Sequence, residues 1–290
     1  MNPPKKIAAL HDLSCLGRCA LTVIIPTLSV MGYQVIPVPT ALLSTHTGGY
    51  TDLHFCDLTD NMGQISAHFE RLDTRFDSIY TGFLGSTEQI QTVECFIKRF
   101  GSEKDGIKPL ILIDPVMGED GELYSTYTEE LADGIRHLCQ YADIITPNLT
   151  EACFLTGFPY RNTKEMCEID ARTYANELMD RLEAQYSCRI AITGIRLHNG
   201  GVANLCSDEN KQRFFSQQPE CGHSYPGTGD IFASVLLGKL IGGESFPASV
   251  DAAADFVAHL IRSTIPLSTA TREGVALEPE LWRLIPKQID

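Results

Sequence analysis

Six short apolar runs alternate along the chain with stretches of helical length. Each run is bounded by turn residues, which is typical of buried strands. In chain order the runs are KIAAL, YQVIPVPT, SIYTGF, PLILIDP, ADIITPN and RIAITG. The stretches of helical length are residues 19–31, 60–72, 87–100, 129–141, 165–186 and 246–263. Because parallel strands need such crossovers, the pattern predicts a doubly wound α/β fold, with a mostly parallel sheet and helices on both faces.

The last third of the chain interrupts this alternation. The stretch GVANLCSDENKQRFFSQ predicts two antiparallel strands around a polar turn. Residues 223–238, HSYPGTGDIFASVLLG, then place two glycines and an aspartate before a run that is too apolar for a solvent-facing helix. Since no linker separates two regions of different composition, we expect one domain over residues 1–290.

The segments that follow the strands supply the candidate site, because ligands of open α/β sheets bind beyond the carboxyl ends of the strands. These segments are HDLSCLGR, ALLSTHTGGY, GFLGS, DPVMGED, TPNLTE and TGIR. Almost all of them carry polar residues or glycine. Turns are rich in the same residues for structural reasons alone, so any single segment keeps that simpler interpretation.

The GTGD sequence carries the most specific chemistry. Gly227, Thr228 and Gly229 at a helix start would aim several unpaired N–H groups at one point, which predicts an anion hole. An aspartate there would repel the same anion. Asp230 is therefore interpreted as a general base that takes a proton from an attacking hydroxyl during phosphoryl transfer. The alternative is that Asp230 only caps the helix and complements its dipole.

Acidic residues after neighbouring strands add a candidate metal site. Asp114, Glu119 and Glu151, with Asn148 nearby, offer oxygen ligands for Mg²⁺ between nucleotide phosphates, either directly or through water. The chain has neither a GxxxxGK[ST] motif nor a kinase HRD and DFG set, and no dinucleotide fingerprint follows the first strand. These absences require another type of ATP-using fold.

Composition narrows the class of partner. The formal net charge of −14 and the lack of a Lys/Arg block argue against nucleic acid. No apolar run reaches membrane-spanning length and the start MNPPKKIAAL has no cleavage-like site, so we expect a soluble cytoplasmic protein without a membrane partner. The ten cysteines lack a CxxC pair and lie mostly in apolar segments, which favours core positions over disulfides or zinc.

Several motifs together resemble a known family. GTGD before a late apolar helix, with DPVMG and TPNLTEACFLTG upstream, resembles the ribokinase-like superfamily, and LLSTHTGGY with YTGFLGS is similar to its pyridoxal kinase branch. The likeness runs from about residue 6 to beyond residue 260. It implies a three-layer α/β/α fold and ATP-dependent phosphorylation of a B6 vitamer: pyridoxal, pyridoxamine or pyridoxine.

The resemblance also implies roles for matching residues. Asp230 would activate the 5′-hydroxymethyl group, Gly227 to Gly229 would hold the transferring phosphate, and Asp114 and Glu151 would manage Mg²⁺ and phosphate charge. The remaining assignments are Thr146, Thr193 and Tyr124 for the nucleotide, and Ala41, Leu43, His46, Thr47 and Phe83 for the pyridine ring. ATP and Mg²⁺ are implied, a monovalent cation stays open, and a homodimer is expected.

The chain departs from the family pattern at three positions. Asp12 stands near where a pyridoxal kinase usually has a serine, although Ser14 could take that role in another register. An aspartate there would pair with a protonated pyridine nitrogen or with the amine of pyridoxamine, which makes pyridoxamine a favoured substrate. Glu119 replaces the usual aspartate and Phe83 a common tyrosine; neither change removes the chemistry.

Other interpretations stay open at this point. His46 could be a hydrogen-bonded structural histidine, Phe83 ordinary core and Thr193 a strand end. Cys221 and His223 allow a nucleophile hypothesis, which sequence proximity alone does not establish. As a whole the chain could also be a hydroxymethylpyrimidine kinase, a kinase of another small alcohol, or a binding protein that holds a vitamer without transferring phosphate.

Overall fold

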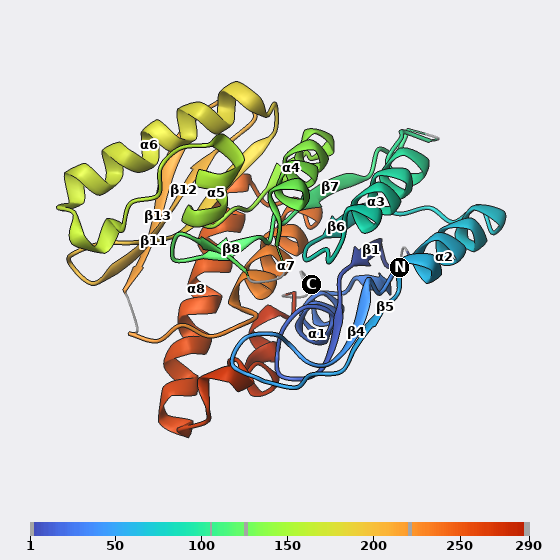
Figure 1. The fold of residues 1–290 in the computed structure, drawn as a ribbon, viewed down its shortest axis with the longest axis horizontal. Helices are drawn as coiled ribbons and strands as arrows, with labels where there is room; N and C mark the ends of the chain where they lie inside the picture. The colour runs from blue at the N-terminus through green and yellow to red at the C-terminus, as the bar shows by residue number, and fades with distance from the viewer. Residues whose placement is uncertain (1–2, 105, 125–126, 220–221, 287–290) are drawn as a thin grey trace.

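An eight-stranded sheet forms the centre of the molecule (Figure 1). The computed structural model describes residues 3–104, 106–124, 127–219 and 222–286. The strand order is β13-β12-β11-β10-β7-β6-β1-β3, and the pairings β11–β12 and β12–β13 are antiparallel while the others are parallel. The strands are β1 (Lys6–Leu10), β3 (Gln34–Pro37), β6 (Ser78–Thr81), β7 (Leu110–Ile113), β10 (Ile144–Ile145), β11 (Arg189–Arg196), β12 (Gly201–Ser207) and β13 (Arg213–Pro219). All six predicted parallel strands and the antiparallel pair are confirmed.

Two helical layers cover the sheet. One layer contains α2 (Thr59–Arg71), α3 (Thr87–Phe100), α4 (Glu129–Leu138), α5 (Leu149–Thr156) and α6 (Glu168–Gln185). The other contains α1 (Leu21–Val30), α7 (Thr228–Ile241) and α8 (Phe246–Thr264). Strand β1 shows the division: Ala8 and Leu10 pack toward the first layer, and Ile7 and Ala9 toward the second. The predicted three-layer α/β/α architecture is confirmed.

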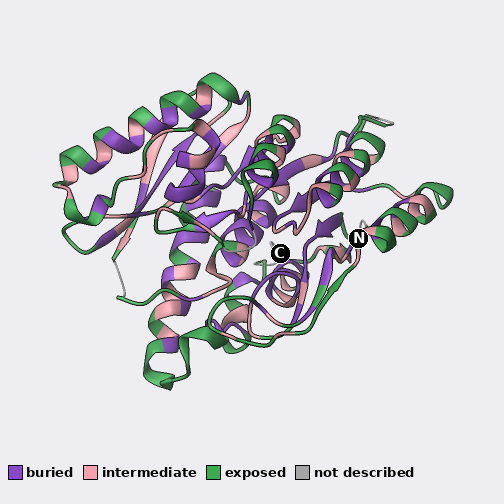
Figure 2. Cartoon of the chain, viewed as in Figure 1, coloured by how far each residue is buried: buried purple, intermediate pink, exposed green. Residues whose placement is uncertain are grey.

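Burial follows this layering. Most strands of the sheet and most of α7 are buried, whereas the edge strands β3 and β13 are largely half-buried or exposed and α2, α3 and α6 expose one side (Figure 2). Helix α7 buries eight consecutive residues from Ile231 to Gly238, as its apolar sequence requires. The start of this helix is thereby fixed to the core.

Short elements complete the chain. The 3₁₀ helices are η1 (Cys139–Tyr141), η2 (Thr163–Glu165), η3 (Ile265–Leu267), η4 (Thr271–Glu273) and η5 (Glu278–Leu284). A hairpin is formed by β8 (Gly118–Glu119) and β9 (Glu122–Leu123). Within the described part of the chain, no helix combines the length and apolar character needed to span a bilayer.

Two segments predicted as turns, HDLSCLGR and ALLSTHTGGY, contain the strands β2 (Leu13–Leu16) and β4 (Ala41–Thr45). Together with β5 (Phe55–Asp57) they form a small separate sheet in the order β2-β4-β5. In β4, Ala41 and Leu43 are buried while Leu42 and Ser44 are exposed, which is the alternation of a half-buried strand. The small sheet lies beyond the carboxyl end of β1, beside the candidate site.

A helix and part of the cysteine prediction also need correction. TPNLTE does not stay a turn, because Asn148 and Glu151 form a capping box that starts α5.

Four cysteines are buried as expected and Cys188 is half-buried, but four others are exposed: Cys15, Cys56, Cys95 and Cys167. All nine described cysteines are free, and Cys221 lies outside the described residues.

Candidate active site

The start of α7 is shaped by glycine. Gly227 has a φ of +79°, and a Cβ there would collide with the carbonyl oxygen of Arg18, so only glycine fits. A Cβ on Gly229 would meet nothing within 4 Å, because that residue faces open space. Thr228 donates from Oγ1 to the carbonyl oxygen of Tyr225 at 2.9 Å. The first N–H groups of this helix therefore face an open surface, which suits an anion.

Asp230 reaches across to the start of another helix. Its Oδ2 accepts a hydrogen bond from the backbone N–H of Ala20 at 2.8 Å, just before α1. Gly227 is the N-cap of α7 and no side chain caps that helix. Asp230 therefore does not cap α7, but it lies in the first turn of that helix, where its charge complements the helix dipole. Burial, together with repulsion from Asp114 and Asp12, raises the pKa of Asp230 to about 8 against the opposing effect of the Ala20 hydrogen bond.

Asp114 follows β7 and is buried. Thr146 donates from Oγ1 to Asp114 Oδ1 at 2.9 Å, so Thr146 orients this carboxylate from the end of β10. Burial raises the pKa of Asp114 to about 7, with the Thr146 hydrogen bond opposing the shift. Thr146 was assigned to the nucleotide, and its described contact is with the acidic residue.

Glu151 joins α5 to the β8–β9 hairpin. Its Oε2 accepts from the N–H of Asn148 at 2.8 Å and its Oε1 accepts from the N–H of Met117 at 3.2 Å. Burial and repulsion from Asp114 raise the pKa of Glu151 well above its usual value. Both oxygens thus hold backbone in place, so Glu151 contributes negative charge from a fixed position.

Glu119 and Tyr124 lie on the solvent side of this group. Ser224, in the loop before α7, donates to Glu119 Oε1 at 3.4 Å. Burial raises the pKa of the Tyr124 phenol, and repulsion from Glu151, Glu119, Asp114 and Asp230 raises it further. All four carboxylates predicted for metal binding and catalysis therefore lie close enough to the Tyr124 phenol to raise its pKa.

These acidic groups are suited to a hydrated cation. Among the described residues no three His, Cys, Asp or Glu side chains form a ready cluster of metal ligands. Neither a lysine nor an arginine of the described chain contributes to the raised pKa values of Asp114, Glu151 and Asp230. Carboxylate oxygens without a cation fit Mg²⁺, which usually keeps several waters.

On the other side of Asp230, the structure brings Asp12 and Ser14 together. Ser14 donates from Oγ to Asp12 Oδ2 at 2.9 Å, and both side chains are buried. Burial raises the pKa of Asp12, and the Ser14 hydrogen bond opposes the shift. Ser14 also lies opposite Leu43 in the β2–β4 pairing. Asp12 and Ser14, the two residues considered for the serine position of the family, therefore lie together beside β4.

The other residues assigned to the pyridine ring differ in environment. Ala41 and Leu43 are buried, Phe83 is half-buried with its ring centroid 5.9 Å from that of Tyr127, and Thr47 is exposed. His46 is buried and uses both ring nitrogens.

The N–H of Gly48 donates to Nδ1 of His46 at 3.1 Å, and Nε2 lies 2.6 Å from the carbonyl oxygen of Arg272. Since Nδ1 accepts, Nε2 must carry the proton and donate. His46 therefore ties its loop to η4, as the structural interpretation requires.

Thr193 lies in β11 beside the start of α5. Its N–H donates to the carbonyl oxygen of Pro147 at 2.9 Å, and it forms an isolated bridge with Asn148. Gly194 follows with a φ of +71° at an irregularity of the β11–β12 pairing. The half-buried Thr193 thus marks a break in the strand next to the acidic residues.

His11 is a buried residue with no predicted role. It directly follows β1 beside Asp12, is fully buried, and neither ring nitrogen has a partner among the described residues. Its ring packs edge-on against Tyr80 at 4.3 Å, and burial lowers its pKa to about 3, so the ring is neutral. The available signal was a histidine at the carboxyl end of a buried strand. His223, from the nucleophile hypothesis, is exposed.

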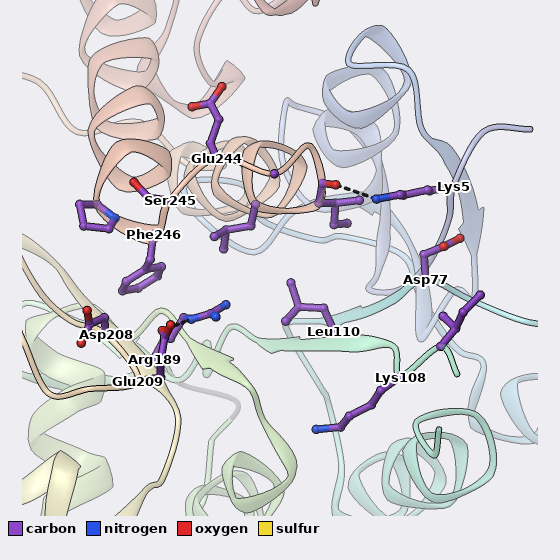
Figure 3. A pocket seen from close by; sticks show the side chains of 15 residues that line it. Lys5, Asp77, Lys108, Leu110, Arg189, Asp208, Glu209, Glu244, Ser245 and Phe246 are labelled. Carbon is purple, nitrogen blue, oxygen red and sulfur yellow. Dashed lines mark hydrogen bonds and ion pairs between the residues drawn. The ribbon is translucent and has the colours of Figure 1, made fainter. Parts of the chain in front are cut away.

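A cavity lies at the opposite end of the sheet (Figure 3). It has a volume of about 520 Å³ and is lined by residues at the amino ends of strands, including Lys5, Lys108 and Arg189, and by Phe246 of α8. None of the residues predicted for the site borders it. This cavity and the candidate chemistry therefore lie at different ends of the sheet.

Comparison with known proteins fits the geometry at the carboxyl end. Residues 24–273 match the family described as phosphomethylpyrimidine kinase. The chain belongs to this family. A crystal structure from Bacteroides thetaiotaomicron, described as a phosphomethylpyrimidine kinase in a form with pyridoxal, is 41% identical, with a TM-score of 0.87 and coverage of 99% of this chain and 98% of that one. Pyridoxal kinase from Lactobacillus plantarum is 30% identical, with a TM-score of 0.86 and coverage of 97% and 96%.

Curated relatives in this family divide between two activities. Hydroxymethylpyrimidine/phosphomethylpyrimidine kinase of Haemophilus influenzae is 26% identical over 90% of this chain and 92% of its own length. The pyridoxal kinase of Dictyostelium discoideum is also 26% identical, over 80% and 77%. The resemblance to the pyridoxal kinase branch and the ribokinase-like fold are confirmed. The chain is a small-molecule kinase that transfers phosphate to an alcohol group.

Proposed function

We propose that this kinase transfers the terminal phosphate of ATP to the 5′-hydroxymethyl group of a B6 vitamer, with Asp230 as general base. The observation that carries the proposal is the environment of Asp230. Its carboxylate stands beside the open start of α7, has no cationic partner among the described residues, and has a pKa raised to about 8. A base with a pKa near the working pH is effective in proton transfer.

The proposed reaction needs only ATP, the vitamer and a proton acceptor that this chain supplies. The vitamer hydroxyl attacks the terminal phosphorus, its proton passes to the free carboxylate oxygen of Asp230, and the bond to the bridging oxygen breaks to release ADP. The N–H groups at Gly227 to Gly229 would stabilise negative charge on the transferring phosphate. The Ala20 hydrogen bond holds Asp230 in place.

Mg²⁺, when bound, would neutralise phosphate charge. Asp114 and Glu119 would hold it through oxygen atoms or their waters, while Glu151, whose oxygens are both occupied by backbone N–H groups, adds charge. Thr146 would orient Asp114, and Tyr124 and Thr193 would border the nucleotide.

The preferred vitamer follows from Asp12. Its buried carboxylate accepts a hydrogen bond from Ser14 and has no lysine or arginine partner among the described residues. A protonated pyridine nitrogen or the amine of pyridoxamine would therefore supply the missing positive charge. Pyridoxamine is therefore the expected best substrate. Ala41, Leu43 and Phe83 would supply the apolar walls, with Thr47 at the exposed edge.

A hydroxymethylpyrimidine kinase is the second candidate, favoured by the relative from Haemophilus influenzae, whose name carries that activity. The substrate of that reaction also presents a hydroxymethyl group on a nitrogen heterocycle, so the same base and anion hole would serve it.

From the family resemblance we further propose a cytoplasmic homodimer. Light scattering of the purified chain would test the dimeric state.

One assay separates these functions. Purified enzyme with ATP and Mg²⁺ is supplied in turn with pyridoxal, pyridoxamine, pyridoxine and hydroxymethylpyrimidine, and ADP release is coupled to a spectrophotometric readout. Turnover of the three vitamers, with the highest kcat/KM for pyridoxamine, is the expected result. Turnover of hydroxymethylpyrimidine alone replaces the substrate but keeps the mechanism. Vitamer binding without ADP release rejects the kinase mechanism in favour of a binding protein.

A further inference from the structure

The side chain of Gln89 connects three separate segments of the chain. It lies in the first turn of α3 and is fully buried. Its Nε2 donates to the carbonyl oxygen of Thr40 at 2.9 Å and to Asp57 Oδ2 at 3.0 Å, while its Oε1 accepts from the N–H of Gly85 at 2.8 Å. Only this orientation of the amide satisfies two acceptors and one donor, so the contacts define it.

The three partners adjoin the proposed pyridine pocket. Thr40 immediately precedes Ala41, and Asp57 lies opposite Ala41 in the β4–β5 pairing. Gly85 follows Phe83 by two residues, and a Cβ at Gly85 would lie 4.0 Å from Cε1 of Phe83. Gln89 therefore fixes the segment that carries Phe83 relative to the strand that carries Ala41.

An apolar residue could not replace these contacts. Leucine would fill a similar volume. It would, however, leave the N–H of Gly85 without its acceptor, and the Gln89 hydrogen bonds that hold the Gly85 segment to Thr40 would be lost. Asp57 has a second connection, since its Oδ1 accepts from the N–H of Thr59 at the start of α2 at 2.8 Å. The amide thus completes a network rather than one isolated hydrogen bond.

We propose that Gln89 is a positioning residue for the alcohol substrate, because it sets the distance between the Phe83 segment and β4 and so the width of the ring pocket. It does not reach the reacting atoms. This inference rests on the proposed function, since that function makes Ala41 and Phe83 walls of the vitamer site. The nucleotide side, around Asp114 and Tyr124, makes no described hydrogen bond to Gln89.

The test compares KM values for the two substrates. In Gln89→Leu, which removes all three hydrogen bonds, KM for the best alcohol substrate should rise about tenfold or more, while KM for ATP should stay within about twofold. Gln89→Glu places a second carboxylate against Asp57 and should act similarly. The double variant Gln89→Glu/Asp57→Asn should recover part of the loss, because the new amide can donate to the new carboxylate.

Thr264→Val is the matched control. Thr264 is a buried residue away from the pocket whose hydroxyl donates to Leu260 and accepts from the N–H of Ala276. Its loss should lower Tm without changing either KM.

Equal changes in both KM values, or none, in Gln89→Leu and Gln89→Glu would overturn the inference, as would failure of Asp57→Asn to rescue. If the native chain transfers no phosphate, the proposed function fails instead. The Kd of pyridoxal from fluorescence titration then replaces KM in the same comparison.

Discussion

The two ends of the central sheet handle charge in opposite ways. At the amino ends, around the cavity of Figure 3, Arg189 pairs with Glu209 at 2.6 Å and Lys108 with Asp143 at 2.8 Å. At the carboxyl ends, several carboxylates are buried or half-buried with no described cation beside them: Asp12, Asp114, Glu151 and Asp230. Arg189 and Lys108 at the amino ends thus have carboxylate partners, whereas the carboxylates at the end with the candidate chemistry have no described cationic partner.

This difference has a physical reason. Burying a charge without a partner costs free energy, so such groups destabilise the fold unless a ligand completes them. Paired charges at a surface contribute little either way. Uncompensated carboxylates on a rigid sheet edge therefore indicate a ligand site more directly than cavity volume does in this molecule.

Substitution of Asp114 should remove one of the uncompensated carboxylates at the carboxyl ends of the strands and so weaken Mg²⁺ binding. In Asp114→Asn the apparent affinity for Mg²⁺ during turnover should fall about 10- to 100-fold, because one anionic oxygen is lost. A titration of rate against Mg²⁺ at fixed ATP measures the change. An unchanged midpoint would show that Asp114 does not support the cation.

We expect kcat/KM to depend on pH through the protonation of Asp230. Asp230 must be deprotonated to act as a base, and its pKa in the free protein is raised to about 8, so kcat/KM should rise with pH through that value. Asp114 contributes repulsion to this shift, so Asp114→Asn should move the rise to lower pH. A profile that is flat from pH 6 to 9, or a shift to higher pH, would contradict the assignment.

The same charge predicts a smaller effect on stability. The folded-state pKa of Asp230 lies above its usual 3.8, so the folded state binds more protons and its stability falls as pH rises between these values. Asp230→Asn removes this cost and keeps an acceptor for Ala20. Its Tm should exceed that of the native chain by about 3 °C at pH 8 and by less at pH 5.

The amino-end control is Glu209→Gln, which weakens the exposed pair with Arg189 and should change Tm by no more than about 2 °C at pH 8. Thermal scans by circular dichroism at both pH values check this. A lower Tm for Asp230→Asn than for the native chain at pH 8 would contradict the charge argument.

Much of the main sheet could be predicted from local pattern. Its strands are apolar runs between turn residues, and the crossovers have helical length. The small sheet was missed because its strands are only three to five residues long and adjoin turn residues, although Ala41 to Thr45 show the alternation of a strand. The capping box at Asn148 and Glu151 was likewise readable from spacing.

The site was predictable in residue type but not in contacts. Polar residues after parallel strands gather at one edge by topology alone, which is why Asp114 could be named, whereas Asp230 was predicted from the glycines at the start of an apolar helix. The hydrogen bond from Ala20 to Asp230 spans 210 residues, and that from Gln89 to Thr40 spans 49. Such pairings depend on how loops pack in three dimensions, so spacing along the chain carries no signal for them.

The most direct test of the central claim is the rate of phosphate transfer by native enzyme, Asp230→Asn and Glu209→Gln at saturating ATP, Mg²⁺ and the best vitamer. The account predicts a fall of about 10²- to 10⁴-fold in kcat for Asp230→Asn, with Glu209→Gln within about twofold of the native rate. A kcat for Asp230→Asn within tenfold of native, or an equal loss in both variants, would contradict the role of Asp230 as the base.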